Sequence, residues 1–285
     1  MLVIFAAFKK EAIDLIKLLK FKKTLKNKRT VIYDGLVENK RIVICITGMG
    51  KSNSLFAVKQ VIEMNLEDPV FIIQGVSGTV IENINIGDLI FYESIKNLEQ
   101  FPGEIMQKGN DSYPSDTQKP DENVCKYAGG IENIDIVYPI LNIDFDLLKT
   151  RWEVSKNNPR LLKFSGGLVS YVVTDAMEKN VLNKLYGIEA IDMESYFIAD
   201  AALNSQIPVI CIRSVSDNLS EPISKLITQF SSGNLCFKFI FLIKLIFSRT
   251  KIRSISESYK NINIACRSLN QFVKKVLLPY FGYKL

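Results

Sequence analysis

The chain has 285 residues, 47% of them hydrophobic, which suffices for a buried core and excludes extensive disorder. It contains no histidine, which excludes Ser-His-Asp catalysis, Cys-His catalysis and histidine-ligated metals; acid–base chemistry must use carboxylates, lysines, tyrosines or water. The net charge of +6 is concentrated at the C-terminus, where residues 235–285 carry ten Lys or Arg and a single acid, Glu257.

Apolar runs of strand length alternate with runs of helical periodicity through the first two-thirds of the chain. This alternation is typical of an α/β architecture with a largely buried sheet. We therefore predict a twisted mixed β-sheet flanked by helices, in one domain over residues 1–230, and a basic amphipathic helical extension over residues 231–285. In chain order the expected elements are strand 2–8, helix 11–20, strand 41–47, helix 51–65, strands 69–80 and 86–95, strand 166–174, helix 176–187, a strand end running into a helix over 189–205, and strand 207–215.

Two segments interrupt this pattern. Residues 96–126 are polar and contain Pro and Gly, and a loop of this length is typical of a flap over a site or of disorder. Residues 235–247 (LCFKFIFLIKLIF) are too short to span a bilayer, which needs about 20 residues. A buried helix, an interfacial helix and an oligomer contact all remain open for this run.

The cysteines and the first residues of the chain indicate in which cellular compartment the protein is expected. The five cysteines are scattered and form no C-x-x-C pair, which argues against a disulfide framework or a zinc site. The first residues lack a basic region and a small-residue cleavage site, so no signal peptide is expected. We expect a cytoplasmic protein, with peripheral contact to the inner face of the membrane through the basic C-terminal region as an open alternative.

Two glycine-containing segments follow predicted strands. TGMGKSNS (47–54) is not a P-loop, because Cys45 stands where that motif needs its first glycine. It is not a dinucleotide fingerprint either, because Asn53 replaces the third glycine. We interpret it as a tight turn into a helix whose amides can face an anion or a sugar hydroxyl. QGVSGT (74–79) is a second turn at a strand end, where ligands of open α/β sheets bind.

Five segments, in order, resemble the nucleoside phosphorylase/nucleosidase superfamily: AAFKKEAIDLI, TGMGKSNS, QGVSGTVIENINIGDLI, AIDMES and IRSVSD. The pattern is most similar to the methylthioadenosine/S-adenosylhomocysteine nucleosidase branch. The resemblance covers roughly residues 1–95 and 165–220. It implies cleavage of the N-ribosidic bond of an adenosine-type purine nucleoside with water as nucleophile, no cofactor, no metal and a homo-oligomeric enzyme. No nucleic-acid partner is expected, because the body of the chain has no nucleic-acid motif and no interleaved base-stacking aromatic pattern.

The resemblance also implies roles for individual residues. Asp217 protonates or hydrogen-bonds the purine, and Glu11 activates the attacking water. Glu194 accepts hydrogen bonds from the ribose hydroxyls, Met193 packs under the ribose, and Arg213 braces the acidic site. The other substrate-binding positions implied are Asp192, Ser216, Val76, Ser77 and Gly78.

This chemistry needs no histidine. Breaking the bond develops positive charge on the sugar and negative charge on the base, so carboxylates stabilise the first and an acid neutralises the second. An aspartate that donates a proton needs a raised pKa, which burial at a strand end supplies. Taken singly, each acid has a simpler interpretation: Glu11, Asp192 and Glu194 as first-turn acids of helices, and Asp217 as a turn or N-cap residue. Their occurrence together, in register, favours the site.

Two departures from the family pattern bear on the nucleophile. Val76 stands where nucleosidases have a serine, and Ile73 stands where bacterial purine nucleoside phosphorylases have their phosphate-binding arginine. Hydrolysis is therefore favoured over phosphorolysis. One alternative is the hopanoid-associated phosphorylase branch, in which the enzyme removes adenine from an adenosylated lipid at the membrane surface. A second alternative is a non-catalytic nucleoside-binding or lipid-surface protein.

Overall fold

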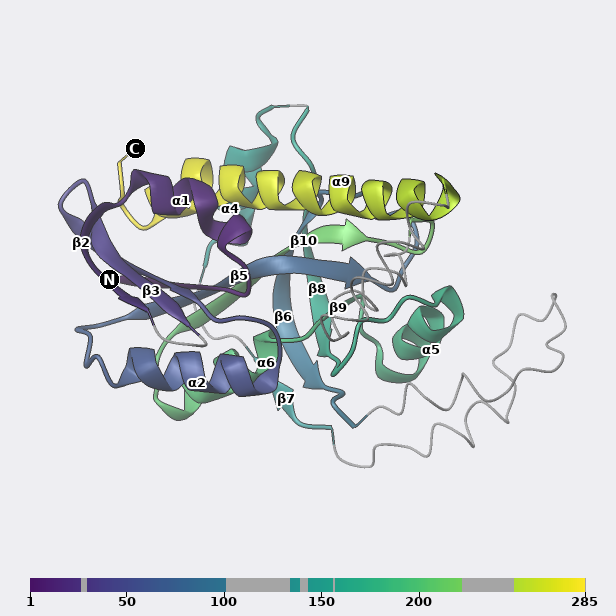
Figure 1. Ribbon diagram of the computed structural model, residues 1–285, viewed down its shortest axis with the longest axis horizontal. Coiled ribbons are helices and arrows are strands. Elements are labelled where there is room, and N and C mark those ends of the chain that lie inside the picture. Colours follow the sequence, from purple (N-terminus) through teal and green to yellow (C-terminus); the bar gives the residue numbers. More distant parts are fainter. Residues whose placement is uncertain (27–29, 101–133, 139–142, 156, 222–248, 285) are drawn as a thin grey trace, which may run out of the picture.

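The computed structural model describes residues 1–26, 30–100, 134–138, 143–155, 157–221 and 249–284 (Figure 1). Strands and helices alternate along most of this length. The elements are β1 (Leu2–Ala6), η1 (Lys9–Ala12), α1 (Ile13–Leu18), β2 (Lys20–Lys26), β3 (Val31–Val37), β4 (Lys40–Ile46), α2 (Lys51–Ile62), β5 (Val70–Thr79), β6 (Leu89–Asn97), β7 (Ile136–Val137), α4 (Phe145–Glu153), β8 (Leu161–Leu168), α5 (Ala176–Tyr186), β9 (Ala190–Asp192), α6 (Ser195–Asn204), β10 (Val209–Asp217), α9 (Arg249–Phe272), η3 (Val273–Leu277) and α10 (Leu278–Tyr280).

The described strands form one mixed sheet in the order β10-β6-β8-β9-β5-β1-β4-β3-β2, with β7 beside β6. The central pairs β1–β4, β1–β5 and β5–β10 are parallel, whereas β2, β3 and β4 pair antiparallel. Strand β10 pairs with both β5 and β6, so this half of the sheet curls on itself. The carboxyl ends of β1, β5 and β10 consequently lie at the same edge, where ligands of α/β sheets bind.

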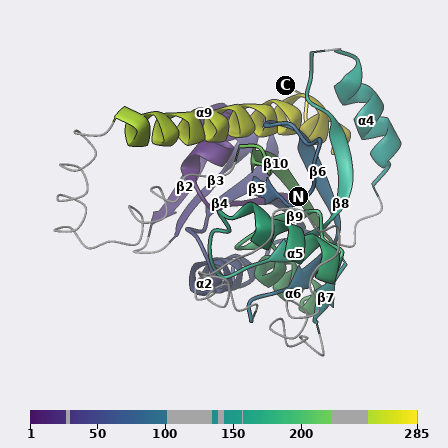
Figure 2. The same cartoon turned by 90° about the vertical axis from the view of Figure 1, so that its right-hand side faces the viewer.

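Each face of the sheet carries its own apolar layer. On β1 the side chains alternate: Leu2 and Ile4 belong to the core under α9, whereas Val3 and Phe5 belong to the core under α2 and α6. Figures 1 and 2 show α1, α4 and α9 on one face and α2, α5 and α6 on the other. The predicted mixed sheet flanked by helices is confirmed.

The C-terminal helix α9 is part of this core. Phe272 is fully buried and packs edge-to-face against Trp152 and Phe91. The Asn270 side chain accepts a hydrogen bond from the Asp14 amide (3.3 Å) and donates one to the Lys10 carbonyl (3.1 Å). The helix is thereby fixed across η1 and α1, beside the predicted site, and the prediction of a helical C-terminal extension is confirmed.

Three predictions fall on residues that the structure does not describe. They are the boundary near residue 230, the apolar run 235–247 and the part of the polar loop beyond residue 100. Among the described helices, none has the length and apolar character that crossing a bilayer requires.

Two element predictions are wrong in detail. The strand predicted over 166–174 is β8 (Leu161–Leu168), which ends before the apolar residues that follow. Two positions within β8 are glycine because neighbouring side chains leave no room for a Cβ. An added Cβ would lie 2.4 Å from Tyr92 at Gly166 and 2.4 Å from Ile188 at Gly167. The second prediction that differs is the helix over 11–20, which ends at Leu18. In addition, the hairpin β2–β3 is missing from the predicted elements, because β2 is the lysine-rich segment KFKKTLK.

Candidate functional site

A cavity of about 490 Å³ opens at the carboxyl edge of the sheet, beside α9. Its volume lies within the range usual for small-molecule sites. Most of its wall is apolar, but four carboxylate residues line it. Of the ten residues predicted for the site, nine line this cavity and Arg213 lies behind its wall. The acids are Glu11, Asp192, Glu194 and Asp217.

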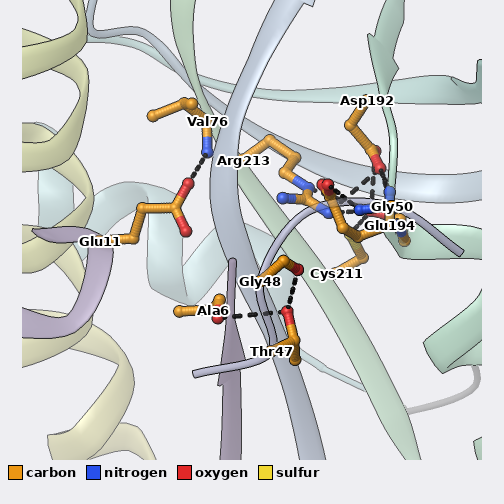
Figure 3. Close-up of polar contacts among 11 residues, drawn as sticks. Ala6, Glu11, Thr47, Gly48, Gly50, Val76, Asp192, Glu194, Cys211 and Arg213 are labelled. Carbon is orange, nitrogen blue, oxygen red and sulfur yellow. Dashed lines mark hydrogen bonds and ion pairs between the residues drawn. The ribbon is translucent and has the colours of Figure 1, made fainter. Parts of the chain in front are cut away.

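Glu11 is held by the turn that follows β1. Its Oε2 accepts a hydrogen bond from the Phe8 amide (2.9 Å) and its Oε1 accepts one from the Val76 amide of β5 (3.1 Å; Figure 3). Burial raises the pKa of the Glu11 carboxyl above its usual value, although these hydrogen bonds and the charge of Arg213 oppose the rise. A carboxylate with a raised pKa is suited to take a proton from water near neutral pH.

Arg213, on β10, is a buried cation that organises the part of the cavity wall formed by Asp192 and Glu194. Its Nη2 donates to Asp192 Oδ1 (3.2 Å), and its Nε donates to the Ser195 hydroxyl (3.0 Å). Burial opposes the charge of the guanidinium, but the neighbouring acids, Asp192 first among them, raise the Arg213 pKa. Gly75 makes room for this side chain, because a Cβ there would lie 2.0 Å from Arg213 Nη1.

Asp192 is occupied by the protein itself. Its Oδ1 accepts hydrogen bonds from the amides of Glu194 and Ser195 (2.8 Å each), and its Oδ2 accepts one from the Ser195 hydroxyl (2.7 Å). It therefore holds the start of α6 and neutralises Arg213 (Figure 3). Of the two roles that the sequence left open for Asp192, these contacts favour the charge at the helix start.

Glu194 faces the start of α2. Thr47, directly after β4, donates to the carbonyl of Gly48 (2.7 Å), and the chain then turns through Gly50, whose φ is +82°. The Gly50 amide donates to Glu194 Oε1 (3.0 Å). Burial, opposed by Arg213 and assisted by Asp192, raises the pKa of Glu194 from 4.5 to about 7. The sequence predicted that amides at the start of α2 can face an anion. One of them, the Gly50 amide, binds the Glu194 carboxylate of the protein itself.

A further part of the cavity wall is formed by the ends of β5 and β10. A register shift between Val215 and Asp217 brings Asp217 opposite Gly78, where an added Cβ would lie 2.7 Å from Asp217 Oδ2. The Ser216 hydroxyl donates to Asp217 Oδ1 (3.0 Å). Ser77 is buried beside them. The glycine therefore allows the carboxylate to lie directly against the neighbouring strand.

Sequence reasoning missed Lys179, on α5. Its side chain is completely buried, and its ammonium forms an ion pair with Asp217 Oδ2. The signal available was its position: Lys179 shares the helical spacing i, i+3, i+7 with Leu182 and Tyr186, both buried. It also missed Tyr259 of α9, which lines the cavity. The centre of its ring lies 4.3 Å from the ammonium of Lys10.

No group of three or more His, Cys, Asp or Glu suited to a metal ion occurs in the described part of the chain. The described side chains of the cavity offer acid–base chemistry. Three acids, Glu11, Glu194 and Asp217, lie around one cavity, with Arg213 and Lys179 behind two of the walls. Such a site can bind hydroxyl groups, stabilise a cation and move protons.

Known proteins are similar to this chain in sequence and in fold. A sequence profile of the phosphorylase superfamily matches residues 2–232. The 5'-methylthioadenosine/S-adenosylhomocysteine nucleosidase of Maridesulfovibrio salexigens is 24% identical over 232 residues, which are 80% of this chain and 90% of that protein. A second nucleosidase of that name, from Desulfotalea psychrophila, is 23% identical over 66% of this chain and 72% of its own.

Solved structures with the same fold include a nucleosidase of that name from Neisseria meningitidis, in complex with methylthio-immucillin-A. It superimposes with a TM-score of 0.63 at 15% identity, over 97% of each chain. Futalosine hydrolase of Helicobacter pylori gives a TM-score of 0.61 at 14% identity, over 96% of this chain and 97% of its own. At these identities the likeness establishes the fold. Together with the profile match over most of its length, it shows that the chain belongs to the phosphorylase superfamily and is an enzyme of the nucleosidase and nucleoside phosphorylase class.

Proposed function

We propose that the protein hydrolyses the N-ribosidic bond of an adenosine-type purine nucleoside. The observation that carries the proposal is the arrangement of Glu11, Glu194 and Asp217 around one cavity, each buried and each on a different element. The named relatives, which are nucleosidases of methylthioadenosine and S-adenosylhomocysteine, support an adenosine-type substrate.

The ribose binds between α2 and α6. Glu194 accepts hydrogen bonds from the ribose hydroxyls through its carboxylate, and Met193, half-buried in the cavity wall, packs under the sugar. As the bond to the base stretches, positive charge grows on the sugar, and the carboxylates of Glu194 and Glu11 stabilise it. Arg213 keeps the acids in place and limits their mutual repulsion.

The nucleophile is water, and Glu11 accepts its proton. Glu11 is suited to this because its pKa is raised and its carboxylate is fixed by the amides of Phe8 and Val76. At the other end Asp217 delivers a proton to the departing purine, so that the base leaves neutral.

The charge of the cavity supports hydrolysis over phosphorolysis. Among the described residues that line it, Lys10 is the only cation and faces four acids. A phosphate dianion entering this site would find Lys10 as its single cationic contact among these described lining residues. Ile73, where phosphorylases of the family have an arginine, is buried in the core under α2.

An apolar substituent on the ribose is supported by the cavity mouth. Met49, Val172 and Tyr259 line the cavity while remaining exposed, so a substrate group can lie against them. A lipid-linked adenosine stays an alternative on this observation. Contact with a membrane and a homo-oligomeric state stay predictions.

A substrate panel tests the proposal. Purified protein is incubated with methylthioadenosine, S-adenosylhomocysteine, inosine and an adenosylhopane, and released base is measured by chromatography. We expect free adenine from the first two, and adenine from the adenosylhopane alone would favour the lipid alternative. Asp217→Asn should lower turnover by about 10²–10⁴-fold, the usual value of a positioned proton donor. The exposed Asp68→Asn is the matched control. Unchanged turnover in Asp217→Asn would refute the role of Asp217.

A further inference from the structure

Lys179 is a lysine that water does not reach. Its side chain has no exposed surface, whereas Lys184, one turn further along α5, is exposed. A buried ammonium loses its hydration and needs a compensating partner. Among the interactions of the described residues, its ammonium makes one with a side chain, the ion pair with Asp217.

Asp217 separates this lysine from the cavity. Asp217 lines the cavity and Lys179 does not, so a bound base meets the carboxylate first. Both oxygens of that carboxylate already accept hydrogen bonds, Oδ1 from Ser216 and Oδ2 from Lys179. Both bonds use the carboxylate as an acceptor, and the donor at Oδ2 is an ammonium, which can transfer its proton along that bond. The hydrogen bond between Lys179 and Asp217 is therefore a path by which a proton can reach the acid that faces the base.

We propose that Lys179 supplies the proton that Asp217 passes to the departing base. This role rests on the proposed nucleoside hydrolysis. Lys179 acts through Asp217, so it is a positioning residue and a proton reserve that does not touch the substrate.

The step balances as follows. When the bond between sugar and base breaks, its electron pair stays on the base, whose five-membered-ring nitrogen takes a proton from the Asp217 carboxyl. The Lys179 ammonium replaces that proton on Asp217 in the same step, so Asp217 is unchanged overall and Lys179 becomes a neutral amine. Water attacks the sugar and gives its proton to Glu11. Between turnovers Glu11 releases this proton to the solvent, and Asp217, which lines the cavity, takes up a proton and passes it to Lys179, which restores all three groups.

A stabilising role alone does not account for this buried pair. Replacing a buried ion pair by apolar residues of similar volume often leaves stability unchanged or raises it, so burial alone does not explain a lysine at this position. The neutral amine that forms during the step suits an unhydrated site, because desolvation penalises only the charged form. A lysine, unlike an arginine, can release its proton in this way.

Two substrates separate proton supply from a structural role. The nucleoside cleaved best by the unaltered enzyme needs a protonated leaving group, whereas a nitrophenyl riboside releases a stable phenolate without one. We expect Lys179→Met and Lys179→Arg to slow nucleoside cleavage by about 10²–10⁴-fold and to leave nitrophenyl riboside cleavage unchanged. Lys184→Met is the matched control and should change neither rate. Thermal unfolding is followed for every variant, and Lys179→Gln replaces Lys179→Met if the latter does not fold.

Each other outcome has a defined meaning. Full nucleoside cleavage by Lys179→Arg would overturn the proposal, because it would show that only the charge is needed. Equal slowing of both substrates in Lys179→Met would overturn it by showing a structural role. If the unaltered enzyme cleaves neither substrate, the proposed function fails and the role of Lys179 fails with it, which distinguishes that case from failure of the Lys179 proposal alone.

Discussion

Replacing Glu194 by glutamine should make the protein more stable above neutral pH and inactive. The carboxyl of Glu194 has its pKa raised from 4.5 to about 7, mainly because it is buried. The folded protein therefore binds a proton between these pH values that the unfolded chain has lost. This contribution to stability is complete below pH 4.5 and is lost as the pH rises to about 7.

The magnitude follows from the difference between the two pKa values. At about 1.4 kcal/mol for each pKa unit, the rise from 4.5 to about 7 amounts to roughly 3 kcal/mol of unfolding free energy. Glutamine retains the oxygen that accepts from Gly50 but cannot ionise, so it avoids this loss. Its ribose-binding capacity falls, because an amide replaces one carboxylate oxygen.

Urea unfolding at about pH 5 and about pH 8 measures the effect. The stability of Glu194→Gln relative to the unaltered protein should increase between these pH values by roughly 2–3 kcal/mol, within the limit set by the raised pKa. Glu82→Gln, at an exposed position, is the control and should show no such change. A relative stability of Glu194→Gln that is independent of pH would refute the assignment of a raised pKa to Glu194.

Two further predictions concern residues that hold the side chains of the site in position. Gly75→Ala places a Cβ 2.0 Å from Arg213 Nη1, so the unfolding free energy should fall by about 1–3 kcal/mol; an unchanged urea midpoint would contradict this close approach. Arg213→Met leaves Asp192 buried without its cation and should cost about 3–5 kcal/mol, of which adding Asp192→Asn should recover part. Strictly additive losses in this double-mutant cycle would show that the two charges are not coupled.

The sequence predicted the location of the site because its motifs follow buried strands. Glu11 follows β1, Val76 to Gly78 end β5, and Asp217 ends β10. Parallel pairing of these three strands brings the ends together. The alternation of apolar runs predicted the mixed sheet, whereas the site residues were predicted from the resemblance to the nucleosidase superfamily, and the pairing of these particular strands was not predicted.

The partners of these residues could not be predicted, because they depend on contacts between distant segments. Lys179 resembles a surface lysine of a helix until α5 is placed against the end of β10. Asp192 acquires its role only when Arg213, 21 positions later, lies across from it. Strand β2 was missed because edge strands are commonly lysine-rich, so its polarity resembles that of a loop.

The central claim is that water, and not phosphate, attacks the ribose. Its most direct test is to incubate the protein with the best nucleoside in phosphate-free buffer and in phosphate buffer and to identify the sugar product. The arrangement of Glu11 and the scarcity of positive charge in the described cavity wall predict free adenine and free sugar at the same rate in both buffers. Base release that requires phosphate, with sugar phosphate as the product, would contradict the claim.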